Sequence, residues 1–184
     1  MSAHMRWLAV LAVLAAGCSS VQTEHPVSAH PEALDKPRLE GLWLLEDEVV
    51  HVRFGADNVG RLAVIDWDGG EFRVRRLEFI VAQAGEGRYL SLRDEDEDHY
   101  DLFAYEFADN GDLVVRAEPT DAFAAAVAEG RLRGEVRKDG DDTEVALASP
   151  SDSLAAFLAS ASPGDLFEGT TLVLKRLPGP EGAE

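Results

Sequence analysis

Residues 50–67, VHVRFGADNVGRLAVIDW, contain the pattern that decides the fold. Val50, Val52 and Phe54 alternate with polar side chains, so one face of an extended chain is apolar and the other is polar. A turn sequence with glycine and asparagine follows at 55–58, and a second alternating segment begins after it. Two such segments joined by a short polar turn are typical of an antiparallel hairpin. This stretch therefore predicts two paired strands.

The alternation continues as far as residue 115, which predicts a meander of antiparallel strands in a sandwich or a barrel. Further alternating segments lie at 72–81, 89–92, 102–107 and 113–115, with turn sequences between them at 68–70, 85–87 and 109–111. In a barrel, the lumen is expected to be lined by the alternating face that carries Val50, Val52, Val64, Phe79 and Leu92.

The last third of the chain has a different pattern. Thr120-Asp121 precedes an alanine-rich stretch that ends at Gly130, which predicts a short helix. Ser151 or Asp152 is expected to cap a second helix, and Pro163-Gly164 to stop it. The predicted fold class is mainly β, with about nine or ten strands and two short helices in the C-terminal third. The last strands are expected at 132–136, 144–148 and 170–177.

The first eighteen residues have the layout of an export signal. Arg6 precedes an apolar run from Trp7 to Ala16, and small residues lead into Cys18, the single cysteine of the chain. The run is about half of the ~20 residues that a helix needs to cross a bilayer, so it does not predict a membrane span. The alternatives are a secreted protein with a chance cysteine at the cleavage site and a cytosolic protein with an apolar N-terminal helix.

Ala16-Gly17-Cys18 resembles the lipobox of bacterial lipoprotein signals. The resemblance implies cleavage before Cys18, attachment of acyl chains such as palmitate to its sulfur, and a protein held on a bilayer of the bacterial cell envelope. One acyl chain binds a membrane only marginally, and stable anchoring takes two or more hydrophobic signals. Ser19 follows the cysteine. By the same resemblance it favours the outer membrane, facing the periplasm, because aspartate at that position often marks inner-membrane retention.

These observations divide the chain into four parts. Residues 1–17 are expected to be a lipoprotein signal peptide. Residues 18–38 are expected to be the lipidated cysteine and a flexible linker, because they contain three prolines and few large apolar side chains. Residues 39–177 are expected to form the β-barrel-like domain, and 178–184 a disordered tail.

Gly41-Leu42-Trp43 resembles the G-x-W opening of lipocalin-like barrels. The resemblance implies that the meander closes into a lipocalin-like barrel, that Trp43 plugs one end of it, and that Lys175 or Arg176 from the last strand packs over the ring. The lipocalin T-D-Y turn is missing, because alanine follows Thr120-Asp121. The order of parts also resembles that of uncharacterised bacterial lipoproteins, which implies a fold and a location but no activity.

Charge and cysteine content exclude some classes of function. The chain carries 17 basic and 35 acidic side chains, a formal net charge of −18. Nucleic acid and anionic lipid surfaces repel such a chain, so nucleic-acid binding is excluded. Lipidation of Cys18 would leave no thiol for a disulfide, and stability is then expected to come from an apolar core.

Residue types that carry chemistry form no recognisable motif. The acidic run at 94–98 could offer oxygen ligands to a cation but lacks the glycine and the alternation of a calcium loop, so it predicts a solvated hairpin loop. Asp66 and Asp68 flank Trp67, where an expected strand ends and enters a turn, and His51 is expected on the outer face of its strand. No zinc or nucleophile motif is present, so no catalytic residue, cofactor or metal is expected.

The sequence therefore predicts a membrane-anchored lipoprotein of the cell envelope, acting as a non-catalytic binding or structural module for a small apolar ligand or an envelope partner. The alternative is an envelope hydrolase or a metal-dependent enzyme that uses the acidic residues near 66–68 or 94–98. A third hypothesis is a surface lipoprotein with a filled core and no small ligand.

Overall fold

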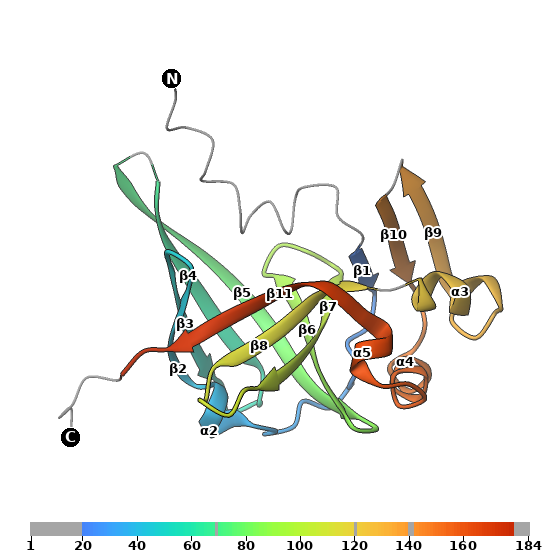
Figure 1. Ribbon diagram of the computed structural model, residues 1–184, viewed down its shortest axis with the longest axis horizontal. Helices are drawn as coiled ribbons and strands as arrows, with labels where there is room; N and C mark the ends of the chain where they lie inside the picture. Colours follow the sequence, from blue (N-terminus) through green and yellow to red (C-terminus); the bar gives the residue numbers. More distant parts are fainter. Residues whose placement is uncertain (1–19, 69, 120, 140–141, 179–184) are drawn as a thin grey trace.

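The computed structural model describes residues 20–68, 70–119, 121–139 and 142–178 (Figure 1). Eight antiparallel strands close into a barrel, which confirms the predicted fold class and is consistent with the resemblance to lipocalin-like barrels. The chain runs around the barrel from β2 to β8, and β11 closes the wall by pairing with both β8 and β2. The barrel strands are β2 (Gly41–Leu45), β3 (Glu48–Phe54), β4 (Gly60–Asp68), β5 (Glu71–Ala84), β6 (Gly87–Asp94), β7 (Tyr100–Phe107), β8 (Leu113–Pro119) and β11 (Phe167–Arg176).

Tight turns join the strands where the turn sequences predicted them. Asn58 has a φ of 59° between β3 and β4, and Gly85 has a φ of 58° between β5 and β6. Gly111, with a φ of 87°, lies between β7 and β8. Asparagine and glycine tolerate this left-handed region, so these residue types set the positions at which the meander reverses.

Three further strands extend the sheet beyond the barrel wall. β1 (Ser20–Thr23) pairs antiparallel with the start of β7 and parallel with β10 (Asp142–Leu147). β10 also pairs antiparallel with β9 (Gly134–Asp139). The described residues thus form eleven strands rather than nine or ten. The additional strand is β1, which lies in the segment predicted to be a linker.

The expectation of a flexible linker at 18–38 is wrong for residues 20–38. Val21 and Val27 are only 3% and 2% exposed, and the Val27 backbone N–H donates to Ser91 Oγ at 3.0 Å. Residues Lys36–Leu39 form a short helix, α2, with Pro37 in its first turn, where a proline costs no intrahelical hydrogen bond. The prolines therefore do not make this segment flexible, and the folded domain begins before residue 39.

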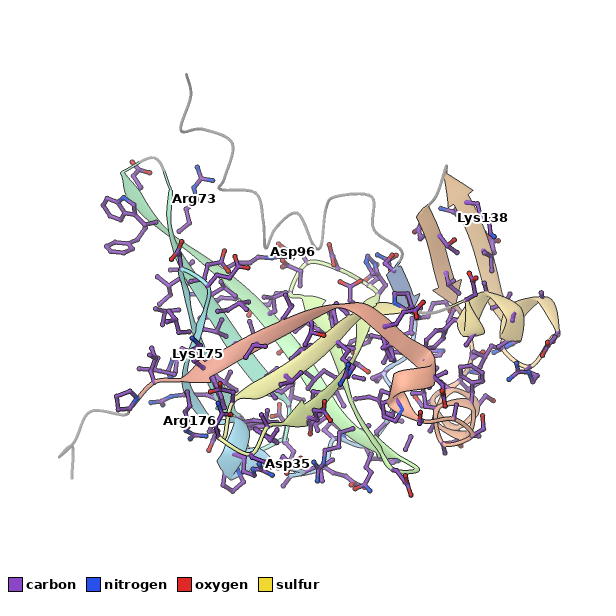
Figure 2. The ribbon with its side chains drawn as sticks, in the orientation of Figure 1. Asp35, Arg73, Asp96, Lys138, Lys175 and Arg176 are labelled. Carbon is purple, nitrogen blue, oxygen red and sulfur yellow. The ribbon has the colours of Figure 1, made fainter. Side chains whose placement is uncertain are left out.

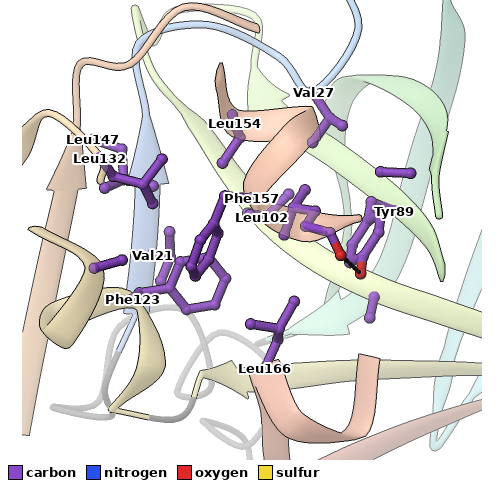
Figure 3. Close-up of a cluster of buried hydrophobic side chains, with 14 of the residues drawn as sticks. Val21, Val27, Tyr89, Leu102, Phe123, Leu132, Leu147, Leu154, Phe157 and Leu166 are labelled. Atoms are coloured by element: carbon purple, nitrogen blue, oxygen red, sulfur yellow. Dashed lines mark hydrogen bonds between the residues drawn. The ribbon is translucent and has the colours of Figure 1, made fainter. Parts of the chain in front are cut away.

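A second core lies outside the barrel, where β1, β10 and three helices cover the outer face of β5, β6 and β7 (Figure 3). The helices are α3 (Ala122–Ala128), α4 (Ser151–Leu158) and α5 (Pro163–Leu166). The outer face of these barrel strands is apolar at the contact, so the insertion between β8 and β11 buries it. The largest fully buried members are Tyr89, Leu102, Phe123, Leu147, Leu154, Leu158, Leu166 and Phe167.

The two predicted helices are present as α3 and α4, but their caps differ from expectation. Asp121 makes no side-chain capping bond, and Ser151 lies inside α4, where its hydroxyl donates to the Pro26 carbonyl at 2.7 Å. Pro163 was expected to stop the second helix, whereas it opens α5. The reason is a capping box in which Ser162 and Asp165 satisfy each other's backbone N–H groups.

Candidate functional site

The barrel encloses an apolar cavity of about 420 Å³. This volume lies within the roughly 300–1,000 Å³ typical of small-molecule pockets. Sixteen of the nineteen lining residues are apolar, and all five residues predicted to face the lumen are among them. The alternation of the strands therefore placed the interior correctly. The apolar lining consists of Leu39, Leu45, Val50, Val52, Leu62, Val64, Val74, Leu77, Phe79, Leu90, Leu92, Phe103, Leu113, Val115, Leu172 and Leu174.

The remaining lining residues, Glu48, Arg73 and Arg75, are charged and come from the starts of β3 and β5. Arg75 Nε lies 3.0 Å from Asp94 Oδ2 at the end of β6. Arg73 lies on the β4–β5 hairpin, which reaches beyond the barrel at this end, whereas Asp35 lies at the opposite end (Figure 2). We call the end with these three charged side chains the mouth. A ligand in the cavity would meet apolar side chains along its length and charged groups at the mouth.

The opposite end of the barrel is closed by α2. Leu39, the last residue of this helix, is 2% exposed and lines the cavity. Trp43 is fully buried next to it, and its indole Nε1 donates to the Leu39 carbonyl at 2.8 Å. Buried tryptophan needs such a partner for its N–H. Leu39 therefore forms part of the floor of the cavity, and the Trp43 indole is hydrogen-bonded to its carbonyl.

The structure brings the predicted pair Trp43 and Arg176 together. The two residues are opposite each other in the β2–β11 ladder, and the guanidinium carbon of Arg176 lies 5.2 Å from the Trp43 ring centroid. The guanidinium also donates to the Arg38 and Glu40 carbonyls at the end of α2. Arg176 therefore ties α2 to the barrel. Lys175, the alternative, pairs with Leu44 and is exposed.

A polar cluster beside α2 was not predicted. Tyr105 Oη donates to Asp35 Oδ2 at 3.1 Å, and Arg88 Nε lies 3.1 Å from the same oxygen. Burial of the Tyr105 hydroxyl, together with the negative charge of Asp35, holds its pKa far above the usual range. Asp35 has a left-handed φ of 52° before α2. The sequence did not reveal this role because Asp35 fell within the expected linker.

The acidic run at 94–98 follows β6 and leads into β7, where the sequence predicted a loop. Its last four residues are exposed, and Glu97 Oε2 lies 3.5 Å from His99 Nε2. His51 points away from the lumen, as predicted, and Arg53 Nε donates to its Nε2 at 3.4 Å. Across the described residues, no three or more His, Cys, Asp or Glu side chains are grouped so that they could hold a metal ion.

Other predicted positions lie outside the described part of the chain. They are Cys18 with the signal peptide, the side chains of Asp66 and Asp68, and most of the tail at 178–184. Among the helices of the described residues, none has the length and apolar character needed to span a bilayer. Comparison with protein-family models, curated proteins and solved structures found no significant match.

Proposed function

We propose that this chain is a binding protein that holds a small apolar ligand in the lumen of its barrel. The observation that carries the proposal is the cavity of about 420 Å³, whose lining is apolar except at the mouth. Burying a ligand there removes apolar surface from water, which favours binding by about 25 cal/mol for each Å² of apolar surface buried. An eight-stranded barrel whose side chains do not fill its interior has room for one small ligand.

The charged mouth favours one orientation of the ligand in the cavity. Leu39 lines the floor, and all charged lining residues lie at the mouth, so a polar group has no charged side chain to pair with at the floor. A polar group at the mouth would lie near Glu48, Arg73 and Arg75 and remain close to water. Leaving a buried polar group without a partner costs about 1–3 kcal/mol, so the apolar end of the ligand enters first.

Filling the cavity tests this function. The probe is N-phenyl-1-naphthylamine, a neutral apolar dye that fluoresces when it leaves water. We expect the delipidated full chain to bind one dye saturably. Val52→Phe, in the lumen, should weaken binding by about tenfold because the larger ring occupies ligand space without displacing packed atoms.

Val173→Phe is the matched control, because Val173 lies on the outer face of β11 and is 42% exposed. It should bind the dye as the unaltered chain does. Equal binding by the lumen variant and the control, or the absence of saturable binding, would contradict the proposed function. Native mass spectrometry of the protein purified without detergent would then identify the compound that is bound to it.

We also propose that acyl chains on Cys18 anchor this binding protein to the outer membrane of a bacterial cell envelope. The support is the lipobox-like sequence Ala16-Gly17-Cys18 after a short apolar run. Intact-mass analysis should find a mature chain that begins at Cys18 and carries acyl chains. Cys18→Ser should release the chain from membranes or leave it unprocessed. A correctly processed Cys18→Ser chain that stays with membranes after a carbonate wash would exclude this anchor.

A further inference from the structure

The β4–β5 hairpin exposes large apolar side chains at its tip. Trp67 is 51% exposed, Phe72 is 72% exposed and Val74 is 56% exposed. Trp67 and Phe72 face each other across the hairpin, with ring centroids 4.6 Å apart in an edge-to-face arrangement. Figure 2 shows this hairpin reaching beyond the barrel wall, with Arg73 on it. Two aromatic rings on a projecting turn contribute nothing to either core.

The apolar tip continues onto the outer wall of the barrel. Ladder pairing places Val74 beside Ile65, Ile65 beside Val49, and Val49 beside Leu44. Leu44, Val49 and Ile65 alternate with lumen-lining residues, so they lie on the outer face, where a solvated sheet is normally polar. Val74, which is 56% exposed, borders both this face and the mouth of the cavity. We call this surface the outer apolar patch; it consists of Leu44, Val49, Ile65, Trp67, Phe72 and Val74.

The hairpin also differs in charge from the chain as a whole. Residues 60–76 contain four arginines and three acidic residues, whereas the whole chain has a net charge of −18. Arg73 and Arg76 are both exposed beside the apolar side chains. Guanidinium groups pair readily with phosphate oxygens, and arginine keeps its charged end in water while its stem covers apolar surface. The arginines of the hairpin therefore offer partners to lipid phosphates beside its apolar tip, although the acidic run at 94–98 lies at the same end of the barrel.

We propose that the outer apolar patch inserts into the surface of a lipid bilayer, with Trp67 and Phe72 at the level of the headgroups. Aromatic rings with an adjacent polar group favour that interface, and the nearby arginines match lipid phosphates. A second copy of the chain is a poorer occupant, because it brings another 18 negative charges.

The position of the patch connects it to the cavity. Arg73, Val74 and Arg75 of this hairpin line the mouth. Insertion of the tip would therefore bring the mouth to the membrane surface, so that an apolar ligand could pass between bilayer and lumen without crossing water. This consequence rests on the proposed function, whereas insertion of the patch does not.

Trp67 itself is the probe for the experiment. The chain has three tryptophans. Trp43 is fully buried, and the substitution Trp7→Phe in every variant eliminates the fluorescence of Trp7. The full chain is mixed with phosphatidylcholine vesicles whose acyl chains carry bromine, a short-range quencher. We expect the Trp67 emission to shift to the blue and to be quenched. Phe72→Ser with Val74→Ser should reduce the quenching by about twofold or more, because less apolar surface enters the lipid.

A reporter on another face of the barrel controls for binding through the N-terminal segment. Val173→Trp with Trp67→Phe places the exposed indole on β11, with β3 and β2 between it and β4. Its quenching should be less than half that of Trp67, even when sedimentation shows both chains on vesicles. Equal quenching at the two positions, or vesicle binding that leaves Trp67 unchanged, would overturn the proposal, and so would failure of the chain to bind vesicles.

Emission in solution distinguishes the other occupants. If Trp67 is already blue-shifted and shielded from iodide without vesicles, the patch is covered by protein, either another copy or another part of this chain, and membrane insertion is overturned. The cavity-filled variant Val52→Phe should keep full Trp67 quenching. Failure of ligand binding and failure of membrane insertion are therefore separate results.

Discussion

At the residue scale, the contact of Arg176 with Trp43 joins three parts of the fold. The guanidinium comes from the last barrel strand, the indole from the first, and the accepting carbonyls from the end of α2. Trp43 in turn donates to Leu39 in the same helix. Removing either side chain therefore loosens the floor of the cavity as well as the wall.

We predict that Trp43 and Arg176 are energetically coupled. Trp43→Phe should destabilise the fold by about 1–3 kcal/mol, because the Leu39 carbonyl loses its donor in a buried site. Arg176→Gln should cost about 1 kcal/mol, and the double variant should show a coupling of about 0.5–1 kcal/mol. Urea denaturation of the four proteins measures the cycle. Lys175→Gln, next along the strand and exposed, should stay within about 0.5 kcal/mol of the unaltered protein. Strictly additive effects would contradict the coupling.

At the scale of elements, β1 connects the barrel to the β9–β10 hairpin. It pairs with β7 on one side and with β10 on the other, so no other described strand joins the hairpin to the wall. Val21 and Val27 add apolar side chains to the second core. The segment before residue 39 is thus a structural part of the domain.

We predict that trimming Val21 weakens the whole fold. Val21→Ala should lower the free energy of unfolding by about 2 kcal/mol, because it leaves a void in a core where the side chain is 3% exposed. Glu24→Ala is the control, since Glu24 is exposed and takes part through its backbone N–H to the Leu147 carbonyl. Thermal unfolding followed by circular dichroism compares the two. Similar thermal midpoints for Val21→Ala and Glu24→Ala would contradict a contribution of the Val21 side chain to the stability of the fold.

Features set by residues close together in the sequence could be predicted, whereas features set by contacts between distant residues could not. Alternation and turn residues are local signals, so the meander and the lumen face could be predicted from them. β1 has four residues among prolines, and its partner in β10 is more than a hundred positions away, so no local signal marks it. The outer apolar patch was missed for a related reason: placing Val64 in the lumen puts Ile65 and Trp67 on the outer face, but whether distant parts of the chain cover that face has no local signal.

At the scale of the whole molecule, the net charge of −18 opposes compaction. Ion pairs relieve some of this repulsion, including Arg75 with Asp94 and Arg93 with Glu78. Each partly exposed pair contributes only about 0–1 kcal/mol, whereas self-repulsion grows with the square of the net charge. We therefore expect repulsion to outweigh the attraction of the ion pairs, most of all near the run at 94–98, which places five acids together.

We predict that salt stabilises this protein. Raising sodium chloride from about 0.02 M to about 0.5 M shortens the Debye length from roughly 20 Å to roughly 4 Å, which screens long-range repulsion more than contacts at 3–4 Å. The thermal midpoint should rise by several degrees. Glu95→Lys with Asp96→Lys, both at exposed loop positions, should raise the midpoint at low salt and reduce the gain from salt. Lys138→Glu, exposed on β9, should do the opposite. A midpoint that falls as salt is added would show that the ion pairs outweigh the repulsion, because salt would then be weakening a net attraction between the charges.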